Sequence, residues 1–499
     1  MSIVSALFHA CTAGSFPGEL TAQNVSLYHS SPYSIYCERF VPPEHRDPLG
    51  PYRELLLERG IEHEKRVLAS RYPGYPALPY RDASEGFLRL LEEMARGAEV
   101  ICGLPLLFLP ENLQGRIDVI EKCPGRESRL GGYHYVVKEI KLAARIEEHH
   151  ILQAAFYTYL LSRIQGCLPE HFYVINRDME ERQYRYGDYE GRLQEAISGT
   201  ARILEGSEQP TPTYNGAQWP WMTYTNHMAL RLRDISLVCQ VGPRMKKNLA
   251  ARGLRKVWDL SSATPESLQG IPGVGRATAE RLIVNARAVQ KRETILLDRS
   301  ALHFRDCHRE LYLDLEGTDP SGEEEGLEQV DYLIGLTLCE AGEVRYRPFM
   351  AWRIEEEKQM FREFVDFITS LGDTVIYHWH NYERWHLKQL ADRHGLIDVV
   401  EKEIFPRMVD LHRVATRAFA FPTPANGLKD IAKYLGFRWR HDDVNALDAI
   451  AWYLRFQKDP DAWRESVMAV IDYNEDDCMA TKFVKDWLAA RAGSGDVDA

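Results

Sequence analysis

The segment Leu311–Glu316 contains two acidic residues whose spacing could bind a metal ion. Asp314 and Glu316 alternate with leucines, a pattern that predicts a β-strand. Since successive side chains of a strand point to opposite faces, both carboxylates share one face and the leucines the other. A divalent cation would offset the cost of burying two carboxylates together. The alternative is an exposed edge strand whose acids face solvent.

Two later segments supply residues of the same chemical kind. Residues 375–387 predict a short strand followed by a helix, with Glu383 near the helix start, where a carboxylate is favoured. Residues 473–477 predict the start of another helix, in which Tyr473 precedes Asp477 by one turn. Both side chains then lie on one helical face, so a phenol and a carboxylate can converge on one point.

This ordered set resembles the DEDD exonucleases of RNase H-like fold, in their tyrosine-containing subclass, over residues 310–488. Val409–Leu411 and Gly427–Gly436 are also similar to stretches of bacterial members. The resemblance implies a 3'-to-5' exonuclease in which four carboxylates hold two Mg²⁺ or Mn²⁺ ions about 4 Å apart and a tyrosine orients the attacking water. The implied metal ligands are Asp314, Glu316, Glu383 and Asp477, and the implied tyrosine is Tyr473. The family usually has Asp where this chain has Glu383.

A second polar group lies on predicted strands and a helix of the N-terminal region. Residues 115–120 predict a strand containing Asp118, and residues 133–141 predict a strand that ends in Glu139 and Lys141 on one face. An Asp and a Glu could hold one metal ion while the ammonium group stabilises charge developing on a phosphate or positions the attacking water. In the helix that follows, Gln153 and Tyr157 stack one turn apart.

With a histidine on an early predicted helix, this series resembles the PD-(D/E)XK nucleases of RecB type, over residues 25–205. The resemblance implies that the metal ligands are His63, Asp118 and Glu139. It implies that Lys141 is the catalytic lysine and that Gln153 and Tyr157 form the helix motif. Many relatives hold an iron–sulfur cluster with one early and three late cysteines. Cys37 fits the early position, but the late triplet is missing, so we expect no cluster and a buried, apolar Cys37.

Residues 271–282 contain a glycine pattern that resembles a helix-hairpin-helix motif. The glycines allow a tight turn, and backbone amides at the next helix start bind phosphate without reading base sequence. Lysines and arginines are concentrated just upstream, over residues 244–256, and residues 238–243 resemble a degenerate first copy. The expected nucleic-acid contacts are Gly273, Gly275, Arg276, Lys246 and Lys247. The alternative is a small helical spacer whose glycine turn only packs.

The sequence patterns predict an α/β multidomain protein. Residues 1–205 would form a restriction-endonuclease-like PD-(D/E)XK domain, and residues 206–229, which begin with a cluster of turn formers, a linker. Residues 230–295 would form a small all-helical helix-hairpin-helix segment. Residues 296–499 alternate strand and helix patterns, as expected of an RNase H-like α/β domain.

Composition narrows the class of protein further. The longest apolar runs are far shorter than the roughly 20 residues that span a bilayer, and no export leader is visible, so we expect a cytoplasmic protein without membrane contact. Nine cysteines without a CxxC pair provide neither a disulfide framework nor a zinc ribbon. The net charge of −12 means that any nucleic-acid binding must use local basic patches.

Taken in order, the three regions resemble a family of bacterial RecB-like nucleases with this domain order. The leading hypothesis is a Mg²⁺- or Mn²⁺-dependent DNA nuclease with two chemically distinct sites, one of which trims 3' ends, in repair, recombination or defence. A second hypothesis is a DNA-binding scaffold with one degenerate nuclease domain that recruits a helicase or another repair or defence partner. A third is RNA processing, since this metal chemistry does not select the sugar.

Overall fold

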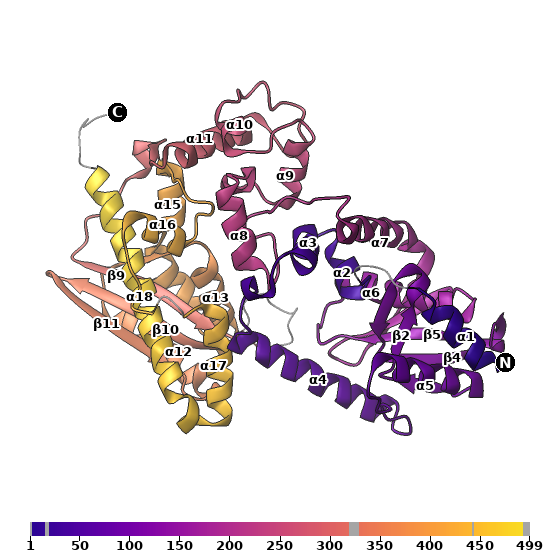
Figure 1. Ribbon diagram of the computed structural model, residues 1–499. Helices are drawn as coiled ribbons and strands as arrows, with labels where there is room; N and C mark the ends of the chain where they lie inside the picture. The colour runs from indigo at the N-terminus through magenta and orange to yellow at the C-terminus, as the bar shows by residue number, and fades with distance from the viewer. Residues whose placement is uncertain (1, 15–18, 319–328, 442–443, 493–499) are drawn as a thin grey trace. The chain divides into compact units, whose positions relative to one another are not determined.

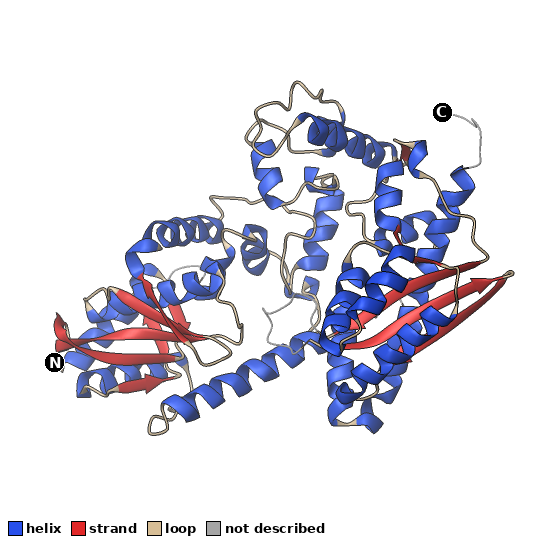
Figure 2. Cartoon of the chain, turned by 180° about the vertical axis from the view of Figure 1, so that it is seen from behind, coloured by secondary structure: helices blue, strands red, loops and turns tan. Residues whose placement is uncertain are grey.

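The computed structural model describes residues 2–14, 19–318, 329–441 and 444–492. The chain divides into two compact units, the first extending to His227 and the second beginning at Met228, except that Gly50–Tyr52 belong to the second. Each unit contains one five-stranded sheet with helices packed against it (Figure 1, Figure 2). None of the described helices is long and apolar enough to cross a membrane.

The sheet of the first unit has the spatial order β1-β4-β5-β6-β7. β4 and β5 form an antiparallel hairpin, and β5 pairs in parallel with β6 after a crossover through helix α6 (Glu148–Gln165). The strands are β1 (Val100–Cys102), β4 (Val119–Ser128), β5 (Gly131–Ile140), β6 (His171–Ile175) and β7 (Glu181–Arg185). A separate hairpin consists of β2 (Pro105–Phe108) and β3 (Leu113–Arg116).

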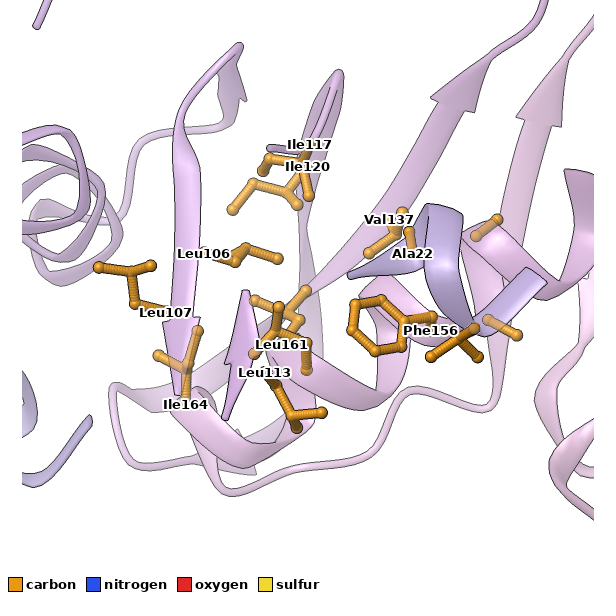
Figure 3. Packing of buried hydrophobic residues seen from close by; sticks show 14 of the residues in the cluster. Ala22, Leu106, Leu107, Leu113, Ile117, Ile120, Val137, Phe156, Leu161 and Ile164 are labelled. Atoms are coloured by element: carbon orange, nitrogen blue, oxygen red, sulfur yellow. The ribbon is translucent and has the colours of Figure 1, made fainter. Parts of the chain in front are cut away.

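Helix α6 lies in the centre of this unit's core. Figure 3 shows its Phe156 and Leu161 near Leu106 of β2 and Val137 of β5, all members of one buried cluster. The helix ends at Gly166, whose φ of +70° is the left-handed conformation that terminates many helices. Because most of α6 is buried, the polar residues that it carries are held in fixed positions. The other helices are α1 (Ile3–Thr12), α2 (Ala22–Leu27), α3 (Pro32–Phe40), α4 (Pro51–Arg71), α5 (Ala83–Arg96) and α7 (Glu190–Glu205).

The second unit begins with short helices joined by two similar turns. Before α11, Gly273 has a φ of +84° and Gly275 occupies the N-cap. Before α9, Gln240 has a φ of +77° and Gly242 occupies the N-cap. The degenerate first copy therefore adopts the same turn, with a glutamine in a backbone conformation that favours glycine. The helices are α8 (Met222–Arg231), of which residues 228–231 belong to this unit, α9 (Pro243–Ala250), α10 (Val257–Ser261) and α11 (Arg276–Lys291).

A mixed sheet of order β11-β10-β9-β12-β13 follows. β9 to β11 run antiparallel, whereas β12 is parallel to both β9 and β13. The strands are β9 (Arg309–Gly317), β10 (Asp331–Glu340), β11 (Glu343–Met350), β12 (Val375–His378) and β13 (Met408–Asp410), with a small pair of β8 (Ile295–Leu296) and β14 (Phe419–Ala420). The helices are α12 (Glu357–Ser370), α13 (Tyr382–His394), α14 (Ile397–Val399), α15 (Leu411–Ala418), α16 (Leu428–Leu435), α17 (Ala446–Lys458) and α18 (Pro460–Ala492).

The two faces of this sheet pack against different helices. Leu311, Leu313 and Leu315 of β9 join a buried cluster with α12 and α13. Tyr312 points to the other face and joins the cluster that contains residues of α18. The alternation predicted for this strand is therefore confirmed, and it directs the two acids of β9 toward the long helix α18, which runs along the sheet in Figure 1.

Two local predictions are wrong. The strand predicted over residues 115–120 is interrupted, because β3 ends at Arg116 and β4 begins at Val119. Asp118 lies in the break, and its carboxylate accepts a hydrogen bond from the Ile140 amide at 2.7 Å. The helix predicted to start at Tyr473 instead begins at Pro460, since no proline or glycine interrupts residues 461–477.

Candidate active site

Three carboxylates converge between the central strand β9 and the helix α18. Asp314 and Glu316 come from β9, and Asp477 comes from α18. Each offers one oxygen, and these oxygens lie within 4.8 Å of one another, the one such group of metal-ligand side chains among the described residues. Carboxylate oxygens gathered in this way suit a hard divalent cation such as Mg²⁺ or Mn²⁺.

Hydrogen bonds fix the orientation of two of these carboxylates. The side-chain amide of Asn474 donates to Oδ2 of Asp314 at 2.6 Å, and the hydroxyl of Tyr346 donates to Oδ1 of Asn474 at 2.8 Å. The indole N–H of Trp439 donates to Oδ1 of Asp477 at 2.7 Å. Hydrogen-bond donors of this kind hold metal-binding carboxylates in place. The other oxygen of each carboxylate therefore keeps a fixed direction.

The electrostatics of the cluster favour a bound cation. Burial raises the pKa of Asp314 well above its usual value, and the charges of Asp477 and Glu316 raise it further. Burial and the charge of Asp477 likewise raise the pKa of Glu316. Burial raises the pKa of Asp477 to about 6, although Trp439 and Lys429 stabilise its charged form. Three carboxylates that repel one another in a buried site would be stabilised by a divalent ion.

Glu383, the predicted fourth ligand, lies close to this cluster but outside the group of three. It is buried at the start of α13, and its charge raises the pKa of Asp314. Its Oε2 lies 3.4 Å from Nδ1 of His378, yet neither atom has a hydrogen-bond partner among the described residues. A buried carboxylate oxygen without a partner fits a metal ligand, so the donor set can accommodate a cation near Glu383 as well.

Tyr473 lies one turn before Asp477 on α18, as predicted. Burial raises its pKa, and the charges of Asp477, Glu316 and Asp314 raise it further, so the phenol stays protonated beside the cluster. The ammonium group of Lys429, on α16, lies 4.4 Å from the centre of the Tyr473 ring. This cation–π contact holds the ring next to the carboxylates.

The first unit gathers most of the second predicted group. Lys141 Nζ lies 3.0 Å from Oε1 of Glu139 and donates to Oε1 of Gln153 at 2.6 Å. Burial raises the pKa of Asp118, and the charge of Glu139 raises it further, so these two acids are neighbours. Burial alone would lower the pKa of Lys141, but Glu139 and Asp118 raise it, which keeps the amine charged. The buried Oε2 of Glu139 has no hydrogen-bond partner among the described residues.

The remaining predicted residues of the first unit have different surroundings. Tyr157 lies near the same acids. Burial raises its pKa, and the charges of Glu139 and Asp118 raise it further. A Cβ at Gly115 would lie 2.5 Å from the Tyr157 ring, which explains the glycine. His63 is buried on α4 with its Nδ1 3.1 Å from Arg66, and burial followed by that charge lowers its pKa. A neutral imidazole of this kind can bind a metal ion.

Cys37 is fully buried, as predicted, and burial raises its pKa to about 12. The thiol therefore stays protonated and packs as an apolar group.

The helix-hairpin-helix segment presents part of its predicted nucleic-acid surface. Gly273, Gly275 and Arg276 are exposed at the turn and at the start of α11, and Lys247 is exposed on α9. Lys246 differs, because it is buried and its ammonium group lies 2.9 Å from the equally buried Asp234. Lys246 therefore stabilises the interior of this segment and is not exposed for contact with phosphate.

Comparison with known protein families assigns two of these regions. Residues 311–489 match the RNase_H superfamily, and residues 233–288 match the SAM-like helix-hairpin-helix tandem. The C-terminal region is an RNase H superfamily domain. Together with the tandem helix-hairpin-helix, it indicates a nuclease that processes nucleic acid. No curated protein matches the chain. Neither family match reaches residues 1–232.

Three residues of the C-terminal site were not singled out from the sequence. Asn474 lies between the predicted residues Tyr473 and Asp477, and its place in that helical turn was the one available signal. Lys429 and Trp439 are distant from the site in sequence and reach it only through the packing of α16 and the following segment against α18.

Proposed function

We propose that residues 296–499 carry a Mg²⁺- or Mn²⁺-dependent exonuclease that hydrolyses phosphodiester bonds and trims 3' ends of DNA. One observation carries the proposal: Asp314, Glu316 and Asp477 direct oxygens to within 4.8 Å of one another in an RNase H superfamily domain. The identity of the metal, the DEDD subclass and the 3'-to-5' polarity are parts of the proposal.

The roles of the side chains follow from their positions. Asp314, Glu316 and Asp477 would hold the cation, with Glu383 as the fourth ligand. A bound divalent ion would activate a water molecule and stabilise charge on the attacking and leaving oxygens. The protonated phenol of Tyr473, beside the carboxylates, would orient the attacking water.

A cleavage assay tests the proposal. Single-stranded and duplex DNA and RNA, labelled at either end, are incubated with wild type and with Asp314→Ala in Mg²⁺ or Mn²⁺. We expect stepwise shortening from the 3' end by wild type, and loss of several orders of magnitude in Asp314→Ala. Asp373→Asn is the matched control, because Asp373 is an exposed acid of the same domain that pairs with Arg305. Equal activity in wild type and Asp314→Ala contradicts the proposal.

We also propose a second, chemically distinct nuclease site of the PD-(D/E)XK type in the first unit. The support is local: a hairpin of β4 and β5, a crossover through α6, and Lys141 held between Glu139 and Gln153. Asp118 and Glu139, with His63, would hold the metal ion, while the charged Lys141 would stabilise negative charge on the phosphate. Tyr157 would complete the helix motif.

The two sites can be separated by substitution. Asp118→Ala should remove one cleavage activity while leaving 3' trimming intact, and Asp314→Ala should do the reverse. Glu170→Gln, an exposed acid 3.9 Å from Arg185 in the same unit, is the control for Asp118. If Asp118→Ala cleaves every substrate as wild type does, the second site is not a nuclease.

The helix-hairpin-helix segment is proposed to bind the nucleic acid. The exposed turn of Gly273 and Gly275 and the cations Arg276 and Lys247 fit sequence-independent contacts with phosphates. Such contacts weaken strongly with salt, which distinguishes this role from that of a helical spacer.

One observation favours a second candidate function. Glu383 lies outside the group of three carboxylates, with its Oε2 3.4 Å from Nδ1 of His378, which motivates an alternative in which this domain is a degenerate, DNA-binding scaffold for a helicase or other repair or defence partner. A Mn²⁺ titration of thermal stability decides between the two, because a retained site is stabilised and a degenerate one is not. Competition between matched DNA and RNA oligonucleotides tests the RNA-processing alternative.

A further inference from the structure

An apolar groove of about 480 Å³ lies within the second unit, between the helix-hairpin-helix segment and α16 of the RNase H-like domain. Its walls come from α10, the end of α11 and the end of α16. Its residues are distinct from the carboxylate cluster and from the turn of Gly273 and Gly275.

Two aromatic side chains are exposed in this groove. The exposed fraction is 46% for Trp258 of α10 and 39% for Tyr434 of α16. Outside the groove, the guanidinium of Arg491 lies 3.6 Å from the centre of the Trp487 ring on α18. Exposed aromatic side chains that gather at one place indicate a binding surface.

Two arginines line the same groove as these aromatic side chains. Arg233 has a φ of +48° and Arg292 a φ of +60°, and both are exposed groove residues. Arg292 caps the C-terminus of α11, and Arg233 follows the end of α8, so both side chains project from helix ends. Neither arginine forms an ion pair with a carboxylate among the described residues. The groove therefore presents cations that a polyanion can neutralise.

We propose that this groove binds single-stranded nucleic acid and holds it beside the exonuclease site. Unpaired bases can stack on Trp258 and Tyr434 while the arginines contact phosphates, the combination that single-strand-binding proteins use. Bases inside a duplex have no free faces, so the same surface selects single strands.

The position of the groove connects it with the carboxylate cluster. α16 carries Tyr434 in the groove and Lys429 beside Tyr473, and five residues of helix span about 7.5 Å. The groove and the lysine beside Tyr473 therefore belong to the same short helix, which links the two places in the fold. This inference rests on the exonuclease proposed above and names its substrate class.

Binding is measured on the full chain in EDTA, where no metal-dependent cleavage occurs. Fluorescein-labelled oligodeoxythymidine and oligouridine are titrated by anisotropy, with a blunt DNA duplex in parallel. Trp258→Ala and Tyr434→Ala should each raise the single-strand dissociation constant about 5- to 150-fold. Trp258→Phe should restore most of the affinity, and duplex binding should change little. Arg233→Ala and Arg292→Ala should each reduce the slope of log affinity against log salt by about 0.7.

Trp463→Ala is the control for Trp258→Ala, because Trp463 also lies beside an arginine, with Arg455 5.0 Å from its ring centre, but does not line the groove. Trp463 and Trp487 lie on the same helix, about 36 Å apart along its axis. Unchanged single-strand affinity in both aromatic variants overturns the proposal, even if a protein partner proves to bind the groove. If the variants lose affinity but the wild type never cleaves, the exonuclease assignment fails and the binding site stands.

Discussion

Gly335 of β10 provides a sharp test of how Asp314 is oriented. A Cβ at this position would lie 1.5 Å from Oδ1 of Asn474 and 3.0 Å from the hydroxyl of Tyr346. Gly335→Ala would therefore push Asn474 away from the two groups that it joins. Asn474 donates to Asp314 at 2.6 Å and accepts from Tyr346 at 2.8 Å, so both hydrogen bonds are at risk.

The size of the effect follows from these distances. Asn474 must move by about 2 Å to reach ordinary van der Waals contact, which a close-packed interior resists. Overpacking of this kind costs about 1–3 kcal/mol of the free energy of unfolding. Loss of the bond that orients Asp314 should weaken metal binding about 10- to 100-fold. Asn474→Ala removes the obstacle as well as the hydrogen bond, so the Gly335→Ala/Asn474→Ala double variant should regain stability but not metal affinity.

Two measurements separate these effects. Denaturant unfolding without metal reports the packing cost, and Mn²⁺ titration of thermal stability and of 3' trimming reports metal affinity. Gly132→Ala is the control, because a Cβ at that strand glycine meets nothing within 4 Å. The reasoning is refuted if Gly335→Ala matches wild type in both measurements, or if the double variant is as unstable as Gly335→Ala.

Further predictions concern the pH response, the hairpin segment and the second site. The folded-state pKa of Asp477 is raised from 3.8 to about 6, so in metal-free protein it contributes stability that is present below pH 3.8 and lost as pH rises through about 6. Asp477→Asn should remove this contribution to melting temperature between those values, and Mn²⁺ affinity of wild type should rise over the same interval. Lys247→Ala should lower the salt slope of duplex binding by about 1 without changing stability. Lys246→Ala should instead lower the free energy of unfolding by about 3–5 kcal/mol, since the buried Asp234 keeps its hydrogen bonds from Ser236 but loses its cation, and wild-type stability would contradict this. Lys141→Met should abolish the cleavage that Asp118→Ala abolishes, and persistence of that activity would remove Lys141 from the mechanism.

Local periodicity determined the parts of the site that lie within one element. Alternation in β9 put Asp314 and Glu316 on one face of the strand. The one-turn spacing in α18 put Tyr473 and Asp477 on one face of the helix. The strand and helix of residues 375–387 and the glycine turn before α11 were predictable for the same reason. In each case the conformation depends on neighbours in the sequence, so the sequence is a sufficient guide.

Tertiary packing decided everything that depends on a second element. Only the docking of α18 on β9 brings Asp477 to the other two carboxylates, and only the packing of α13 against β9 brings Glu383 close to them. Lys246 carries the same charge as its exposed neighbour Lys247, yet the fold buries it against Asp234. The sequence by itself determined which residues could bind metal and phosphate and which of them share a face. The tertiary structure decided which of those residues meet, because distances between elements arise from the packing of side chains far apart in the chain.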